Sequence, residues 1–236
     1  LWLARGCLIL DQRPQWCEYF LQSGMTKAFL VPDLANQLIN TLDEQGSTSS
    51  PLDFSLTVAG GFISRKLAEQ IIKRVTTNLR ILYGSTEINI LVLEAKVTNL
   101  DDLHWLGCRE SRTVEIIDEA GSICPIDVEG QLRVRLSELD CLSYLDDLES
   151  SEKVFKSRYF YPGDMAVRRA DGRIRILGRS VDVVNFRGQK LAVAPIEHNI
   201  QHHLGVENVC LFSGINSEGE EEVVIAIESA QYPEQS

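Results

Sequence analysis

The sequence of 236 residues has no Cys-x-x-Cys pair, no excess of basic residues and no apolar run close to the roughly 20 residues of a membrane span. Its six cysteines are scattered, which favours reduced thiols within a core over metal ligands or disulfides. The formal net charge of −11 argues against nucleic acid and anionic membranes as partners, because either would approach a repulsive field. We expect a cytoplasmic protein without a membrane span.

The chain also lacks an initiator methionine, and its start has no basic segment followed by a cleavage site. It opens inside an apolar segment, LWLARGCLIL, so we expect a fragment of a longer protein. There is no internal repeat. The one marked charge run, EGEEE, is most simply a solvated approach to a hairpin.

The first third of the chain alternates short apolar runs with helical patterns that begin near a proline or serine. Ser64 is a plausible N-cap for one of these helices. This β-α-β-α-β-α-β order predicts a parallel sheet with crossover helices. The apolar runs are residues 6–10, 27–31, 53–61 and 79–84, and the helical patterns are residues 13–24, 32–46 and 64–75.

From about residue 106 the pattern changes to alternating strands joined by turn residues, with Asp171 and Gly172 as a hairpin turn. An antiparallel sheet or small barrel fits this region, with strands at residues 113–118, 122–126, 130–136 and on either side of that turn. The tail has a β-α-β-β pattern, at residues 179–191, 194–205, 206–214 and 221–229.

The fold class is therefore predicted as α/β in three parts. Residues 1–105 form a parallel-sheet α/β subdomain, residues 106–179 a small antiparallel β-barrel subdomain, and residues 180–236 the start of a small α+β C-terminal domain.

Two strand ends of the predicted parallel sheet carry unusual residues. Ligands of open parallel sheets bind beyond the carboxyl ends of strands. Gly60 and Gly61 follow one strand and would let a ligand approach the backbone. Residues 80–88, RILYGSTEI, end another strand with an aromatic ring, two hydroxyls and a carboxylate, which together suit a planar base, phosphate oxygens and a hard cation. The alternative is an ordinary turn with a solvated glutamate.

A second set of polar residues flanks the predicted hairpin. Asp164 lies just before one strand and Arg179 just after the other, so the two could meet at one edge. Such an Asp accepts hydrogen bonds from a sugar diol, and such an Arg is a fixed cation for a hydroxyl or phosphate. A surface salt bridge is the alternative.

Four segments, in this order, resemble motifs of the ANL superfamily, which comprises acyl-CoA synthetases, adenylation domains of nonribosomal peptide synthetases, and luciferases. They are AGGF, YGSTE, YPGDMAVRRADGRIRILGR and RGQKLAVAPIEHNI, at residues 59–62, 83–87, 161–179 and 187–200. The resemblance covers nearly the whole chain.

The resemblance implies an ATP site. Tyr83 would stack on adenine and Gly60 and Gly61 would line its pocket, with Gly84 beside them. Thr86 would contact the α-phosphate.

It also implies that Glu87 helps to ligate Mg²⁺, that Asp164 binds the ribose hydroxyls and that Arg179 reaches the ribose or phosphate. Gly188 would line the tunnel for a pantetheine thiol, and Val181 with Asp182 would form the hinge of the C-terminal domain.

The implied reaction joins a carboxylic acid to the α-phosphorus of ATP, and then transfers the acyl group to the thiol of CoA or of a carrier protein. Attack of one anion on another requires charge neutralisation rather than a general base on the protein. The four histidines therefore need not be catalytic.

The sequence also departs from the family. The phosphate loop and the C-terminal lysine are absent, Pro162 replaces a threonine, and Val181 replaces a hinge Asp or Lys. The fragment alone should be nearly inactive in adenylation. Two alternatives follow: a degenerate, non-catalytic scaffold module of a larger synthetase, and a regulator that binds nucleotide without chemistry.

Overall fold

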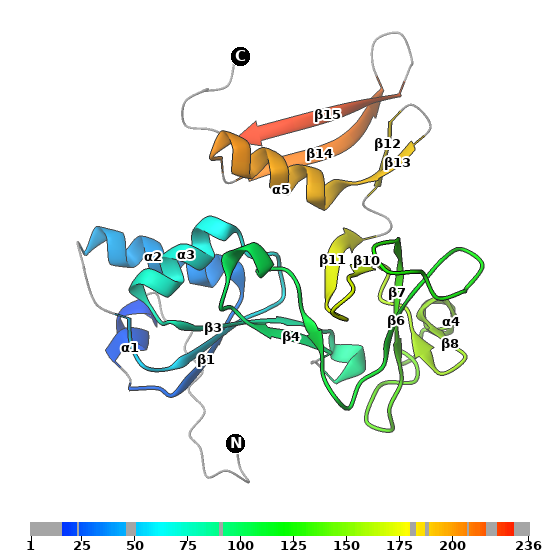
Figure 1. Cartoon of the computed structure of the whole chain (residues 1–236), viewed down its shortest axis with the longest axis horizontal. Helices are drawn as coiled ribbons and strands as arrows, with labels where there is room; N and C mark the ends of the chain where they lie inside the picture. Colours follow the sequence, from blue (N-terminus) through cyan, green and yellow to red (C-terminus); the bar gives the residue numbers. More distant parts are fainter. Residues whose placement is uncertain are drawn as a thin grey trace. The chain divides into compact units, whose positions relative to one another are not determined.

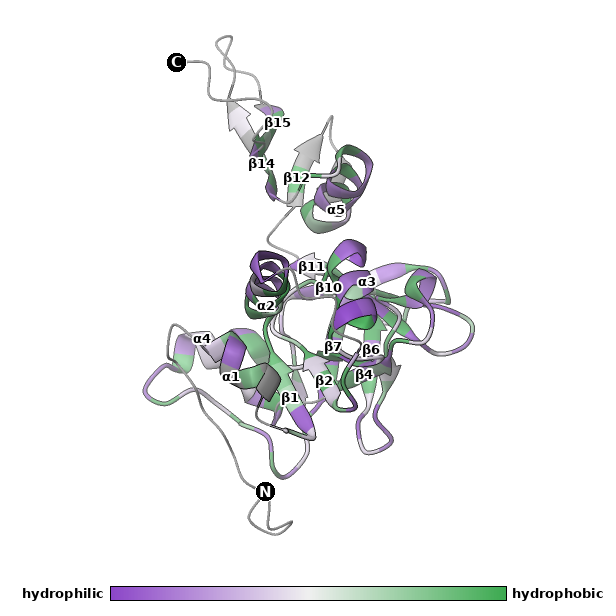
Figure 2. Ribbon diagram, turned by 90° about the vertical axis from the view of Figure 1, so that its left-hand side faces the viewer, coloured by the Kyte–Doolittle hydropathy of each residue, from purple (hydrophilic) through white to green (hydrophobic). Residues whose placement is uncertain are grey.

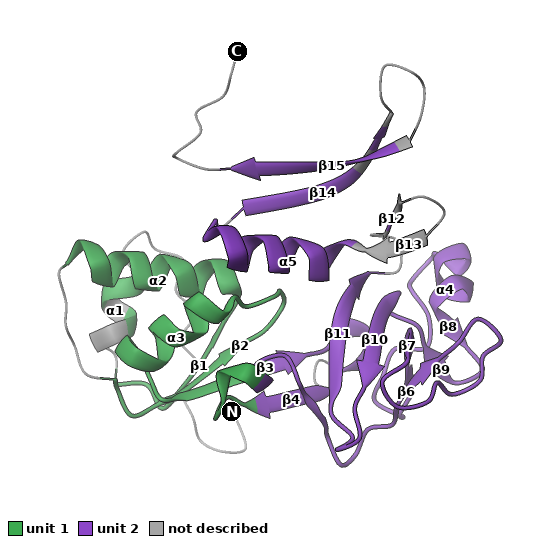
Figure 3. Cartoon of the chain, turned by 45° about the horizontal axis from the view of Figure 1, so that its top comes forward, with its two compact units in different colours: residues 1–81, 96–101 green, residues 82–95, 102–236 purple. Residues whose placement is uncertain are grey.

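The structure is a computed structural model, and it describes residues 16–22, 24–45, 51–89, 92–179, 183–186, 189–206, 208–215 and 221–228 (Figure 1). The chain divides into two compact units (Figure 3). The first comprises residues 1–81 and 96–101, and the second comprises residues 82–95 and 102–236.

The first unit has the predicted alternation of strands and helices. Strands β1, β2 and β3 pair in parallel, with Lys27 opposite Ser55 and Ser55 opposite Asn78. The prediction is confirmed from residue 16 onward, and the predicted strand at residues 6–10 lies outside the described residues. The elements are α1 (Trp16–Gln22), β1 (Lys27–Leu30), α2 (Pro32–Glu44), β2 (Ser55–Val58), α3 (Arg65–Arg74) and β3 (Asn78–Tyr83), whose last two residues belong to the second unit.

Helices α2 and α3 are amphipathic, and Figure 2 shows hydrophilic and hydrophobic residues side by side on each. Apolar residues three or four positions apart share one face of a helix, which is the face that packs inward. The α3 helix begins where the sequence predicted, since the Ser64 hydroxyl accepts a 3.1 Å hydrogen bond from the Leu67 amide. The buried side chains of these helices are Ala35, Leu38, Ile39, Leu42, Leu67, Ala68 and Ile71.

The second unit contains a six-stranded antiparallel sheet in which β11, β10, β7, β9 and β8 are neighbours in that order and β6 pairs with β7. The predicted strands around residues 113–118 and 130–136 are confirmed, as is the hairpin, where Gly172 has a φ of +84° that favours glycine. The strands are β6 (Val114–Ile117), β7 (Glu129–Arg135), β8 (Phe155–Lys156), β9 (Tyr159–Phe160), β10 (Asp164–Arg168) and β11 (Ile174–Arg179).

Of the two predicted alternatives, an antiparallel sheet and a small barrel, the described strands form an antiparallel sheet that does not close. Among them β11 pairs only with β10 at one end of the order, β8 pairs only with β9 at the other end, and β6 pairs only with β7. The predicted strand at residues 122–126 is wrong, because only Ile123 makes a bridge, to Ile117. Pro125 in this segment has no amide to donate to a ladder.

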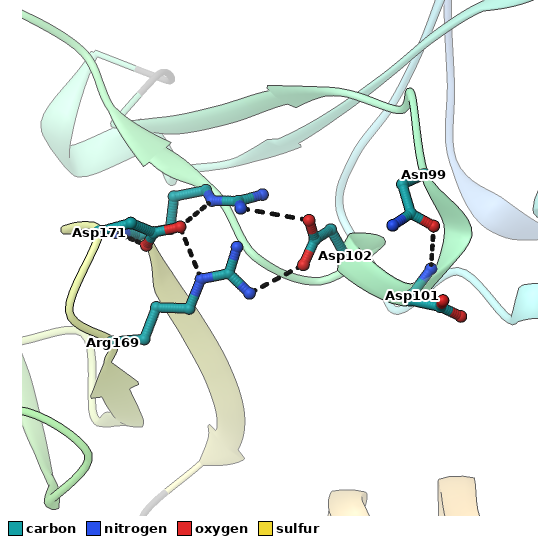
Figure 4. A network of polar contacts seen from close by, with 6 residues as sticks. Asn99, Asp101, Asp102, Arg169 and Asp171 are labelled. Atoms are coloured by element: carbon teal, nitrogen blue, oxygen red, sulfur yellow. Dashed lines mark hydrogen bonds and ion pairs between the residues drawn. The ribbon is translucent and has the colours of Figure 1, made fainter.

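The tip of the β10–β11 hairpin is held by a network of ion pairs, drawn in Figure 4. Arg169 contacts Asp102 and Asp171 at 2.8 Å each. Arg173 contacts the same two carboxylates at 3.2 and 2.8 Å. The guanidinium of Arg169 also lies 4.8 Å from the ring centre of Trp105. These contacts fix the hairpin whose strands carry Asp164 and Arg179.

The C-terminal region of the second unit has β-β-α-β-β order rather than the predicted β-α-β-β. The predicted strand at residues 179–191 holds two alternating segments that pair with each other, with Val183 opposite Ala192 and Phe186 opposite Gln189. The elements are β12 (Val183–Phe186), β13 (Gln189–Ala192), α5 (Val193–Leu204), β14 (Asn208–Ile215) and β15 (Glu221–Glu228). Among the described helices, none has the length and apolar character needed to cross a membrane.

The described cysteines form no disulfide, as the sequence predicted, but they do not share a core. Cys17 is buried, whereas Cys108, Cys141 and Cys210 are exposed. Cys7 lies outside the described residues. The prediction of thiols within a core therefore holds for Cys17 and is wrong for Cys108, Cys141 and Cys210.

Candidate active site

The two polar sets found in the sequence meet in the second unit through Tyr83 and Asp164. Tyr83 ends β3, Asp164 begins β10, and the Tyr83 hydroxyl donates a hydrogen bond to Oδ2 of Asp164. Arg179, the last residue of β11, lies directly opposite Asp164 in the antiparallel pair. Its Nε is 3.2 Å from Oδ1 of Asp164, and its guanidinium also donates to the Pro162 carbonyl at 2.7 Å.

Burial and charge keep the Tyr83 phenol protonated. Burial raises the pKa of Tyr83 well above its ordinary value, and the carboxylate of Asp164 raises it further, against the opposing charge of Arg179. Tyr83 is therefore a hydrogen-bond donor at physiological pH. Asp164 is 8% exposed, and two of its roughly four lone-pair positions are engaged by Tyr83 and Arg179.

The YGSTE segment turns from β3 into a single 3₁₀ turn, Thr86–Ile88. Ile88 is buried and anchors this turn, while Gly84 and Thr86 are exposed. The arrangement leaves the threonine hydroxyl accessible to a ligand.

The Glu87 carboxylate is held in its ionised form. Burial raises its pKa, but hydrogen bonds from its own backbone and from Tyr144, with the charge of Arg179, outweigh burial and lower it. The Tyr144 hydroxyl donates to Oε1 of Glu87 at 2.9 Å. The pKa of Tyr144 is raised to about 12 by burial and by this carboxylate. Glu87 is therefore an ionised carboxylate beside a fixed hydrogen-bond donor.

Sequence reasoning missed the segment that surrounds Glu87, residues 137–147, hereafter the 137–147 loop. The amide of Cys141 donates to the Glu87 carbonyl at 2.8 Å. Arg112 donates to the Ile88 carbonyl at 3.1 Å and to both oxygens of Asp140, at 3.1 and 3.0 Å. Nothing in the local pattern pairs this loop with residues about 50 positions earlier, because the contact depends on the tertiary fold.

Gly60 and Gly61 belong to the first unit, directly after β2. Gly60 has a φ of +80°, which side chains rarely adopt. A Cβ on Gly61 would lie 3.2 Å from Pro32, so Gly60 is favoured by its backbone conformation and Gly61 by packing. Both are exposed. Three other predicted site residues, Val181, Asp182 and Gly188, lie outside the described residues.

Comparison with known protein families gives one match, to the model described as AMP-binding enzyme, over residues 2–139. This segment includes the Gly60–Gly61 pair and the whole YGSTE turn. The chain belongs to the AMP-binding enzyme family.

Curated relatives support the family. The chain is 29% identical over 220 residues to the HC-toxin synthetase of Cochliobolus carbonum, covering 84% of this chain and 4% of that protein. It is 26% identical over 221 residues to the vibriobactin-specific 2,3-dihydroxybenzoate-AMP ligase of Vibrio cholerae, covering 89% and 39%. The chain thus spans less than half the length of these AMP-binding enzymes.

Solved structures share the fold. An amide bond synthetase, McbA, from Marinactinospora thermotolerans superposes with a TM-score of 0.78 at 19% identity, covering 93% of this chain and 45% of that one. The anthranilate CoA ligase AuaEII, in complex with anthranoyl-AMP, has a TM-score of 0.76 at 18% identity, covering 94% and 43%. The α/β fold and the ANL resemblance predicted from the sequence are confirmed.

Proposed function

We propose that the protein containing this chain activates a carboxylic acid with ATP to an acyl-adenylate and passes the acyl group to the thiol of CoA or of a carrier protein. The observation that carries the proposal is the contact of Tyr83, Asp164 and Arg179, which joins two motifs 81 residues apart into one polar group. A pair of unrelated turns would give no such contact. The similar proteins include an anthranilate CoA ligase and the HC-toxin synthetase, which agrees with either acceptor.

In this proposal the described residues of the second unit bind the nucleotide. The aromatic ring of Tyr83 stacks on adenine, and the exposed Thr86 hydroxyl donates to the α-phosphate. Asp164 accepts from the ribose hydroxyls, and Arg179 supplies a fixed cation next to them. Gly60 and Gly61 are assigned to the adenine pocket by the motif alone.

Glu87 is proposed as the protein ligand of Mg²⁺. No cluster of three acidic, His or Cys side chains able to hold a metal is found among the described residues. A single ionised carboxylate fits Mg²⁺ nevertheless, because this ion is commonly bound by one or two carboxylates together with the phosphates of the substrate. Bound in this way, Mg²⁺ neutralises phosphate charge and makes the α-phosphorus a better electrophile.

The protein's own contribution to the chemical step is electrostatic. Negative charge develops on the phosphate oxygens when the carboxylate attacks, and a hydroxyl and a cation held in place stabilise it without reorganisation. His104 and His198 are not needed as bases, and burial lowers the pKa of both. The identity of the acid is not assigned. The apolar side chains that follow Glu87 in the sequence, Val92 and Leu93, are fully buried in the core.

The proposal is tested by following carboxylate-dependent exchange of pyrophosphate into ATP with the full-length protein and a broad panel of acids. We expect exchange with at least one acid and none without added acid. A protein that binds ATP but exchanges with no acid would instead be the scaffold or regulator considered above.

A further inference from the structure

Tyr144 is held in place by contacts of its amide and its ring, in addition to the hydrogen bond from its hydroxyl to Glu87. Its amide donates to the Ser151 hydroxyl at 2.8 Å, and its ring packs edge-on against Phe155 with centres 5.4 Å apart. Ser151 is buried and in turn donates to the Asp147 carbonyl at 2.6 Å. These contacts fix the position of the Tyr144 ring, and therefore of the hydroxyl that donates to Glu87.

The same loop also fixes the main chain that carries the carboxylate. The Cys141 amide bonds the Glu87 carbonyl, and Arg112 links the next carbonyl, that of Ile88, to the buried carboxylate of Asp140. Both the backbone and the side chain of Glu87 are thus determined by contacts from residues 137–147. This is more constraint than an exposed surface glutamate requires for stability.

We propose that Tyr144 is a positioning residue that holds Oε1 of Glu87 and so directs the other carboxylate oxygen, Oε2, toward the magnesium ion of the bound nucleotide. This inference rests on the proposed function, since it gives Glu87 the role of metal ligand. Hydrogen bonds from outside the first coordination sphere orient metal ligands, and their removal typically costs about 10- to 100-fold in metal affinity or activity. Tyr144 itself touches neither substrate nor metal in this arrangement.

The test compares Tyr144→Phe with Tyr159→Phe in the full-length protein. The Phe variant of Tyr144 keeps the ring against Phe155 and removes only the hydroxyl. Tyr159 is a matched control, because its hydroxyl also donates to a carboxylate, Oε1 of Glu115, at 3.2 Å in the same unit. ATP binding is measured by calorimetry over a range of MgCl₂ concentrations and again in EDTA.

We expect Tyr144→Phe to raise the half-saturating Mg²⁺ concentration for ATP binding about tenfold. Its affinity for ATP in EDTA should stay within about twofold of wild type, because the hydroxyl is not a nucleotide contact. Tyr159→Phe should change neither quantity. A general loss of structure would weaken binding under both conditions, so the ratio of the two affinities separates positioning from folding.

Two further variants test whether Tyr144 acts on the Mg²⁺ dependence through its own anchoring and through Glu87. Ser151→Ala loosens the anchor of Tyr144 and should shift the Mg²⁺ dependence in the same direction by a smaller factor. In a Glu87→Gln background, Tyr144→Phe should have no further effect on the Mg²⁺ dependence, because the group it orients is gone. Equal Mg²⁺ dependence of Tyr144→Phe and Tyr159→Phe, or additive effects with Glu87→Gln, would overturn the inference. Failure of the wild-type protein to bind ATP in Mg²⁺ would instead overturn the proposed function.

Discussion

At the residue scale, Asp164 links the two polar sets of the site. It is buried, it accepts from a tyrosine 81 residues earlier in the chain, and it pairs with an arginine across a β-ladder. A carboxylate with two protein partners is already oriented before any ligand arrives. Preorganisation of this kind lowers the entropic cost of binding a sugar diol.

Substitutions of Tyr83 and Asp164 should therefore differ in their effect on AMP binding. Asp164→Asn should weaken AMP binding about 10-fold or more, because hydrogen bonds to a charged partner contribute about 1.5–3 kcal/mol. Tyr83→Phe should have a smaller effect, because it removes one hydroxyl and keeps the ring. Tyr83→Ala should cost about 1–3 kcal/mol more than Tyr83→Phe, the usual contribution of stacking a base on an aromatic ring. Calorimetry with AMP measures all three.

The melting temperature of each variant provides the control for that series. If Asp164→Asn left the AMP affinity unchanged, Asp164 would contribute only to the pairing of β10 with β11. Equal affinities for Tyr83→Phe and Tyr83→Ala would exclude stacking.

At the element scale, the sequence predicted correctly those features whose determining residues lie close together in the chain. The Ser64 cap and the Asp171–Gly172 turn are local devices, and each occurs where the pattern indicated. The meeting of Asp164 and Arg179 followed from the same hairpin. The order of the strands in the antiparallel sheet and the approach of Tyr144 to Glu87 depend on contacts between distant segments. A single sequence carries no comparable signal for these.

The 137–147 loop should depend on the Arg112–Asp140 pair. The side chain of Asp140 is fully buried and that of Arg112 is 9% exposed. Burial raises the pKa of Asp140, but hydrogen bonds from Ser137 and Arg112 outweigh it and lower that pKa, so the carboxylate stays charged. Removal of one member of a buried ion pair leaves an uncompensated charge and typically costs about 3–5 kcal/mol.

Arg112→Met alone should thus lower the free energy of unfolding by about 3–5 kcal/mol, as measured by urea titration. The double variant Arg112→Met with Asp140→Leu should lose less than the sum of the two single variants, because no buried charge remains. The exposed pair of Lys153 and Glu149 on α4 (Leu148–Val154) offers a control, where Lys153→Met should cost less than about 1 kcal/mol. Additive losses for Arg112 and Asp140 would contradict the pairing.

At the scale of the whole molecule, the division into parts remains partly a prediction. The boundaries of the two compact units in the chain fall within β3 and within β4 (Leu93–Lys96), and after residue 101. The boundaries expected from the sequence, near residues 105 and 179, follow changes in the sequence pattern. The C-terminal hinge at Val181 and Asp182 belongs to the same prediction. Described contacts join the C-terminal region to the rest of the second unit, since α5 lies against β11. His104 lies edge-to-face against His198 of α5, with ring centres 5.5 Å apart.

This histidine pair should make stability depend on pH. Burial, together with the nearby positive charges of His198 and Arg175, lowers the pKa of His104 to about 3. In the unfolded chain its pKa is near 6.5. The unfolded state therefore binds more protons than the folded state between about pH 6.5 and 3, so stability is lost as the pH falls through that range. The slope for one such group reaches about 1.4 kcal/mol per pH unit.

His104→Gln should reduce the slope of stability against pH between pH 7 and 5.5, a window chosen because most carboxylates have not begun to titrate there. His203→Gln is the matched control, since His203 is exposed on the last turn of the same helix that carries His198. Urea midpoints across this pH range measure the effect. The control should follow wild type, and the His104 variant should be flatter because its side chain no longer gains a proton on unfolding. Parallel curves for His104→Gln and wild type would show that burial of this ring contributes nothing to the acid sensitivity of the fold.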